Sequence, residues 1–198
     1  MMFTLMSSLA LAGDPCADQV KVDALQEELR IEWEADRKDH GTYRDPGKLE
    51  RLDKSRSALG YKLHKSGKLC NAQSKFYAAA LMTRSESKKV LDAAYELAKV
   101  TMMEHVHGSA WLSAVAYDRR QVSQGLHQRY GTQLNQINGR VCLYPVEEGV
   151  TDAERKQYDI PMLADTYRRV LDANNLEREA AVWESLDTYD LICELKVW

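Results

Sequence analysis

The 198-residue sequence has no marked excess of charge of either sign and no long apolar run. Lysine and arginine together number 27 and aspartate and glutamate 30, which gives a formal net charge of −3. This balance excludes a globally positive surface that would recruit nucleic acid. No apolar run approaches the ~18–20 residues that a membrane-spanning helix needs. We therefore expect no nucleic-acid partner and no transmembrane segment.

The sequence also lacks the short motifs that mark common enzyme and cofactor-binding classes. It contains no G-x-x-x-x-G-K-[ST] phosphate loop, no G-x-G-x-x-G turn and no G-x-S-x-G nucleophile elbow. His105 and His107 are two residues apart, which places them on different sides of a helix and makes a shared metal with His127 a weak candidate. We expect neither a cofactor nor a metal.

The first twelve residues, MMFTLMSSLALA, carry no charged side chain. Ala10 and Ala12 fit the A-x-A pattern of a signal-peptidase site. We expect residues 1–12 to be a signal peptide, residues 13–198 to form a single mainly helical domain, and the protein to be exported to the periplasm or the exterior. The alternative is an apolar N-terminal helix packed on the domain of a cytoplasmic protein.

The four cysteines are Cys16, Cys70, Cys142 and Cys193. An even number in an oxidising compartment favours disulfides, and four cysteines allow three pairings. Buried free thiols are the alternative. If a C-terminal strand pairs with the hairpin described below, Cys142 and Cys193 lie near each other, which leaves Cys16 with Cys70.

Apolar residues at steps of three and four predict most of the chain to be helical. The expected helices cover about residues 18–39, 48–63, 74–83, 85–104, 109–123, a short stretch capped by Thr151 with Glu154, 159–174 and 176–184. The basic stretch at and just after the end of the second of these is interpreted as a solvated face; it contains Lys62, His64, Lys65 and Lys68. Asn138-Gly139 lies between two alternating runs and predicts a β-hairpin over about 131–144. The alternating residues 190–198 indicate a possible C-terminal strand, and the fold class is a compact, mainly α domain with a small β-hairpin.

The segment from Asp118 to Gln133 combines a carboxylate on an apolar helix face with a loop rich in groups that donate and accept hydrogen bonds. Asp118 follows Trp111 and Ala114 at helical spacing, so it is expected to be buried and to need partners. Backbone N–H groups of the following loop, or Arg155, are better partners than Arg119, which points about a quarter-turn away. Asp118 is therefore either a tie between helix and hairpin or a catalytic or ligand-binding carboxylate.

This segment resembles a bacterial domain family for which no activity is established. The shared pattern is A-W-L, then D-R, then G-x-x-Q-x-[YF]-G-T-Q, then a proline and D-x-x-R. The corresponding residues are Ala110 to Leu112, Asp118-Arg119, Gly125 to Gln133, Pro145 and Asp152 to Arg155. The resemblance covers about residues 72–171. It implies that Asp118, Arg119, Gln128, Tyr130, Thr132, Gln133 and Arg155 belong to one constellation.

Two functions remain open at this point, and the sequence does not decide whether the protein is an enzyme. The first is a recognition module that binds a small ligand, a peptide or an envelope component through the Asp118–Gln133 region. Its expected ligand-binding residues are Trp111, His127, Gln128 and Thr132. The alternative is a hydrolase or transferase in which Asp118 is the general base, Arg119 or Arg155 holds an anionic group, and Tyr130 or Gln133 stabilises developing charge.

Overall fold

The computed structural model describes residues 14–42, 45–176 and 191–194. The expected signal peptide and nearly all of the expected helix over 176–184 lie outside these ranges. The helices are α1 (Gln19–Thr42), α2 (Pro46–Lys65), α3 (Ala72–Met82), α4 (Lys88–Met103), α5 (Ser109–Val122), α6 (Asp152–Gln157) and α7 (Leu163–Ala173). The strands are β1 (Leu134–Ile137) and β2 (Arg140–Leu143). The expectation of a mainly α fold with a small hairpin is confirmed.

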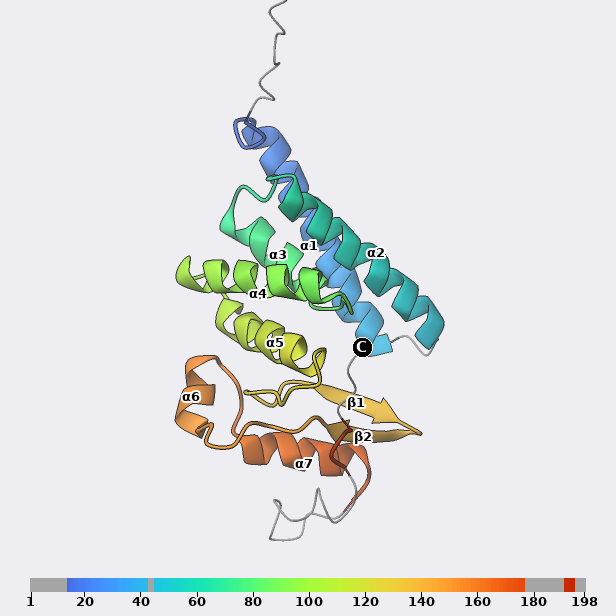
Figure 1. Cartoon of the computed structure of the whole chain (residues 1–198). Coiled ribbons are helices and arrows are strands. Elements are labelled where there is room, and N and C mark those ends of the chain that lie inside the picture. Colours follow the sequence, from blue (N-terminus) through green and yellow to red (C-terminus); the bar gives the residue numbers. More distant parts are fainter. Residues whose placement is uncertain (1–13, 43–44, 177–190, 195–198) are drawn as a thin grey trace, which may run out of the picture.

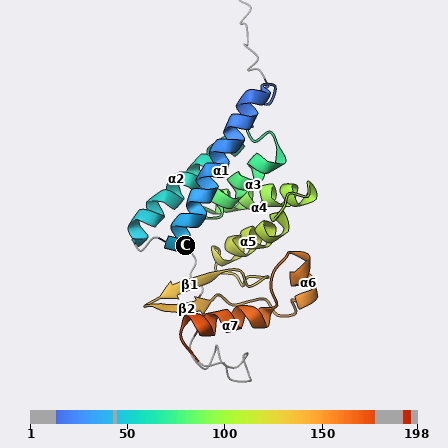
Figure 2. The ribbon, with the colours of Figure 1, turned by 180° about the vertical axis from the view of Figure 1, so that it is seen from behind.

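The elements are stacked in order, from the α1–α2 pair at one end to α7 at the other (Figures 1 and 2). Helices α1 and α2 run antiparallel, α3 packs on both, and α4 and α5 follow as successive layers. The core of this helical half contains fully buried Leu29, Leu81, Met82 and Leu112. The side of α5 that faces away from α4 faces the hairpin (Figure 1). Helix α5 therefore lies between the helical half and the second half, which contains the hairpin, α6 and α7.

The hairpin forms where the sequence predicts it. Strands β1 and β2 are antiparallel, and Ile137 pairs with Arg140 across the turn. Asn138 and Gly139 have φ angles of 52° and 80°. Both lie in the left-handed region that a type I′ turn requires, which explains why Asn-Gly is found here.

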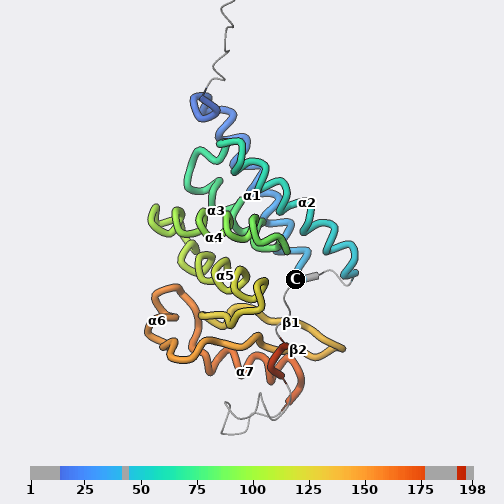
Figure 3. The backbone as a smooth tube through the Cα atoms, in the orientation of Figure 1, coloured from blue at the N-terminus to red at the C-terminus, as the bar shows by residue number. Residues whose placement is uncertain are grey.

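The C-terminal segment returns to the hairpin, as the tube in Figure 3 shows. In residues 191–194 the pairing is a single parallel bridge between Leu143 and Ile192 rather than a named strand. Two hydrogen bonds make it: Leu143 N–H donates to Leu191 O at 2.9 Å, and Cys193 N–H donates to Leu143 O at 2.9 Å. Leu143 and Leu191 join Val170 of α7 in a second, smaller core.

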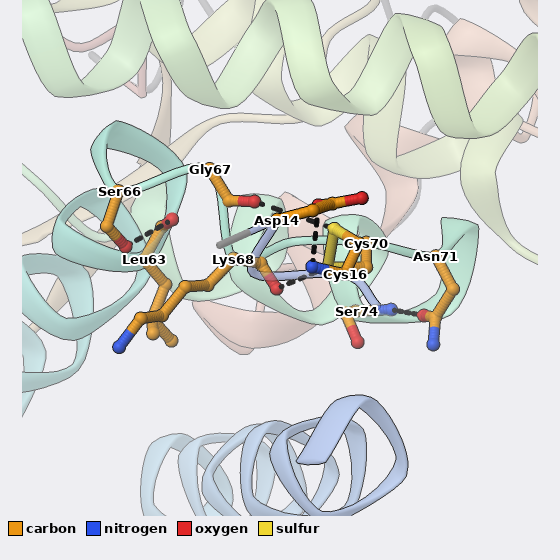
Figure 4. The surroundings of a disulfide bond; sticks show 9 residues. All are labelled: Asp14, Cys16, Leu63, Ser66, Gly67, Lys68, Cys70, Asn71 and Ser74. Carbon is orange, nitrogen blue, oxygen red and sulfur yellow. Dashed lines mark hydrogen bonds between the residues drawn. A yellow bond between two sulfur atoms is a disulfide. The ribbon is translucent and has the colours of Figure 1, made fainter. Parts of the chain in front are cut away.

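All four cysteines are paired. Cys16 bonds to Cys70 and Cys142 bonds to Cys193, which confirms the pairing derived from a C-terminal segment beside the hairpin. The first bond ties the segment before α1 to the loop between α2 and α3 (Figure 4). Next to it, Asn71 Oδ1 accepts a hydrogen bond from Ser74 N–H at 2.8 Å and caps α3. Two disulfides are typical of proteins in an oxidising compartment.

Within the described ranges, none of the helices combines the length and apolar character that crossing a membrane requires.

Candidate functional site

Helix α5 carries Asp118 on its inner side, where the residue is completely buried. Its Oδ1 accepts hydrogen bonds from the N–H groups of Arg129 (2.7 Å) and Tyr130 (2.9 Å). Its Oδ2 accepts from Thr132 N–H (3.0 Å) and from the Thr132 hydroxyl (2.8 Å). Burial raises the pKa of the Asp118 carboxyl above its usual value, although the hydrogen bonds from Tyr130 and Thr132 act in the opposite direction. The expected loop N–H partners are confirmed.

Gln128, also completely buried, closes the same loop on itself. Its Oε1 accepts from Gln133 N–H at 2.7 Å, and its Nε2 donates to Gln133 O at 3.1 Å. Nε2 also donates to Tyr144 O at 2.7 Å, just after β2. The Gln133 side chain donates to Val115 O on α5 at 3.4 Å. Gln128 therefore fixes both ends of the loop and joins it to the hairpin.

Arg155 of α6 holds the loop from the opposite side and is completely buried as well. Its Nη1 donates to Tyr130 O, its Nε to Pro161 O at 2.8 Å, and its Nη2 to Thr166 Oγ1 at 3.2 Å. Burial lowers the pKa of the guanidinium. Its three nitrogens are thus used to join the loop to α6 and α7.

Tyr130 packs in a row of aromatic rings. Its ring centroid lies 4.7 Å from that of Tyr158 and 5.9 Å from that of Tyr117. Burial and a hydrogen bond to Tyr158 raise the pKa of Tyr130, so the phenol stays protonated. Tyr130 is therefore held by its ring, its N–H and its carbonyl together.

The three buried side chains that fix residues 128–133, Asp118, Gln128 and Arg155, are called the loop anchor below. The structure brings six of the seven residues implied by the resemblance into or against this anchor. Their polar atoms bond to one another and to the backbone, so the contacts are those of a tie between α5, the loop and the hairpin. A catalytic role for Asp118, Tyr130, Gln133 and Arg155 stays a prediction, and no feature of this geometry favours it.

Arg119 is the seventh residue, and it points away from the anchor. It lines a cavity of about 610 Å³ between α2, the turn from α3 to α4, and α5. Burial is the main cause that lowers the pKa of its guanidinium. The described residues offer it no hydrogen bond or ion pair, and the carboxylates of Glu86 and Asp53 act on it only at longer range.

The rest of this cavity combines an apolar wall, hydroxyl groups and charged side chains of both signs, which are Glu50, Asp53, Glu86, Lys54, Lys62 and Arg84. Leu49 and Tyr61 of α2 and Val90 of α4 provide the wall. Ser87, at the N-cap of α4, makes no side-chain capping bond. The N-terminal end of α4 therefore presents partly positive N–H groups beside the Arg119 cavity. Sequence reasoning missed Tyr61, and it considered Ser87 only as a helix cap.

The expected ligand residues Trp111 and His127 lie elsewhere. Trp111 is 48% exposed and lines a groove of about 540 Å³ between α1, α3 and α5. Trp33 of α1 also lines this groove and packs on Phe76, and the Arg37 guanidinium lies 5.0 Å from the Trp33 ring centroid. His127 is exposed in the loop after α5. The expected ligand-binding residues are thus distributed over separate surfaces.

Comparison of the chain with models of known families, with curated proteins and with solved structures gives no match in any of the three. The resemblance to the bacterial family stays a prediction, and the site is interpreted from its own geometry.

Proposed function

We propose that this protein is an exported recognition module that binds a ligand with an anionic group and an apolar body in the Arg119 cavity. The observation that carries the proposal is the partly buried Arg119 guanidinium, which has no partner among the described residues. A desolvated cation without a directly bonded counter-charge is unfavourable, and a bound carboxylate or phosphate would reduce that cost.

The surroundings of Arg119 support the same class of ligand. The N-terminal end of α4 favours negative charge, and the free Ser87 hydroxyl offers one more hydrogen bond. Leu49, Tyr61 and Val90 would cover an apolar body. Export is supported by the two disulfides and by the uncharged N-terminal sequence.

The loop anchor has a defined part in this proposal. Arg119 follows Asp118 directly, so the hydrogen bonds from four donor groups to the Asp118 carboxylate fix the last turns of α5. A fixed helix holds the Arg119 side chain toward the cavity at a lower entropic cost. The Asp118–Gln133 region would then contribute to ligand binding by holding Arg119 in position.

The test is a thermal-shift titration of the full chain with four probes: benzoate, phenyl phosphate, acetate and inorganic phosphate. Benzoate and phenyl phosphate carry a ring and should raise the Tm more than acetate and inorganic phosphate. The larger shift of benzoate or of phenyl phosphate identifies the ligand as a carboxylate or a phosphate. The Arg119→Gln variant should lose the shift and be at least as stable as the wild type without ligand, because it removes an unpaired cation.

Arg120→Gln is the matched control. Arg120 is the next residue on α5, does not line the cavity and pairs with Asp92 of α4. The control should keep the ligand-induced shift. Equal shifts in wild type and Arg119→Gln, or no shift with any probe, would show that the cavity is not an anion site.

A further inference from the structure

A second cluster of polar side chains lies where α1 meets α2. Asp36 and His40 are one turn apart on α1, and Asp53 faces them from α2. His40 Nε2 lies 3.0 Å from Asp53 Oδ1 and 3.6 Å from Asp36 Oδ1. One ligand atom from each of the three residues lies within 4.8 Å of the other two.

The buried member of the cluster has an unmet oxygen. Asp36 is 2% exposed, and its Oδ2 accepts from Arg84 Nη2 at 3.1 Å. Its Oδ1 is fully buried, has no hydrogen-bond partner among the described residues and is the atom directed at His40. A His40 ring nitrogen carries one proton at most, and Asp53 Oδ1 already lies at hydrogen-bond distance from it. His40 therefore does not satisfy both carboxylates.

A metal ion would satisfy both carboxylates at once. In a tetrahedral zinc site with bonds of about 2.1 Å to nitrogen and oxygen, neighbouring ligand atoms are about 3.4 Å apart. The two distances from His40 Nε2, 3.0 and 3.6 Å, fall on either side of that value. The two distances from His40 thus match a zinc site, and the ligand atoms of Asp36 and Asp53 lie within 4.8 Å of each other.

The local charge also favours a cation. Asp36 and Asp53 carry two negative charges beside His40. Arg84, paired with Asp36, supplies one positive charge, which leaves an excess of one negative charge when His40 is neutral. This excess favours a bound cation between the two carboxylates.

We infer that Asp36, His40 and Asp53 form a binding site for a divalent transition metal, with zinc as the best fit. One imidazole and two carboxylates suit zinc, and three protein ligands leave a fourth position for water. Asp53 also lines the Arg119 cavity, so the metal would lie at the edge of that cavity. The inference does not depend on the proposed anion ligand.

The test begins with full-length protein that has been stripped with a chelator and dialysed. Isothermal titration with zinc chloride should show one ion bound per chain, and magnesium chloride should give no heat at the same concentrations. Cobalt(II) should give the visible absorption of a four-coordinate site, and zinc should displace it. Circular dichroism confirms that each variant is folded.

His40→Gln and Asp53→Asn should each weaken zinc binding at least tenfold, because each removes a ligand. His64→Gln on α2 is the matched control for loss of a histidine and should bind zinc as the wild type does. Asp36→Asn would complete the set, but it also loses the Arg84 ion pair, so Asp53→Asn is decisive if Asp36→Asn unfolds.

Wild-type protein that binds no zinc at one equivalent would overturn the inference. Unchanged affinity in both His40→Gln and Asp53→Asn would do the same and would place the zinc elsewhere. The unmet oxygen of Asp36 and the unmet Nη1 of Arg56 would then be explained by a buried water molecule.

Discussion

Gly131 lies against the guanidinium of Arg155, so that a Cβ atom on Gly131 would be 2.9 Å from Arg155 Nη1. The same residue has a φ angle of 68°, a conformation that costs other residues roughly 1–2 kcal/mol. Glycine is therefore required here both for the backbone and for the space that Arg155 occupies.

Gly131→Ala should lower the free energy of unfolding by about 2 kcal/mol or more, measured by urea denaturation. Gly139→Ala separates the two causes. Gly139 also has a positive φ angle, 80°, but has no neighbouring atom within 4 Å of its Cβ position. In this control the free energy of unfolding should fall only by the cost of the backbone conformation, about 1 kcal/mol. Equal losses in the two variants would mean that contact with Arg155 contributes nothing.

Asp118→Asn should lower the free energy of unfolding by about 2–4 kcal/mol, because an amide NH₂ replaces an acceptor among four donors. Chemical denaturation followed by circular dichroism gives the value. Asp165→Asn, a change at a half-exposed carboxylate paired with Arg168, should cost under about 1 kcal/mol. A fully stable Asp118→Asn protein would contradict the role of the loop anchor.

The two disulfides close loops of nearly equal length, with separations of 54 and 51 residues. Loop-closure entropy predicts that each contributes about 4 kcal/mol. Cys16→Ser/Cys70→Ser and Cys142→Ser/Cys193→Ser should therefore lower the Tm by similar amounts in a calorimeter. Mass spectrometry after alkylation without reductant should find no modified thiol. Alkylation of any cysteine in the unreduced protein would contradict the pairing.

Trp33 and Trp111, which line the same groove, should differ in what their removal costs in stability. Trp33→Ala should cost about 3–5 kcal/mol, because its ring packs on Phe76 and Tyr77. Trp111→Ala should cost less than about 1 kcal/mol, because Trp111 is 48% exposed. Urea unfolding monitored by circular dichroism compares them without relying on tryptophan fluorescence. Similar losses would show that Trp111 is part of the packed structure.

Features that depend on neighbouring residues in the sequence were predictable. The Asn138-Gly139 turn follows from the backbone conformations those two residues allow, and the hairpin confirms it. The same holds for Thr151, whose Oγ1 accepts from Glu154 N–H at 3.1 Å. A complete capping box would also have the Glu154 carboxylate accept from Thr151 N–H. Among the described residues it accepts instead from Arg129 Nε, at 2.7 Å. Arg129, 25 residues away in the sequence, thus takes the place of the local capping partner of Glu154.

The candidate sites depended on tertiary packing and were only partly predictable. Helical spacing placed Asp118 inside and Arg119 about a quarter-turn away, but only the packing of α2 and the α3–α4 turn around Arg119 creates its cavity. The zinc candidate was missed, since we expected no metal. Its one sequence signal, Asp36 and His40 four residues apart, is common on solvated helices, and Asp53 joins it only when α2 folds back on α1.

The disulfide bonds also decide what a protease can release from this chain. A cut between residues 16 and 70, or between 142 and 193, leaves its two fragments covalently joined. Apart from the two ends, only cuts between residues 70 and 142 can divide the molecule. That stretch contains α3, α4 and α5, which carry most of the buried core. In an oxidising, protease-rich environment, the outer parts could be nicked while the molecule stays in one piece.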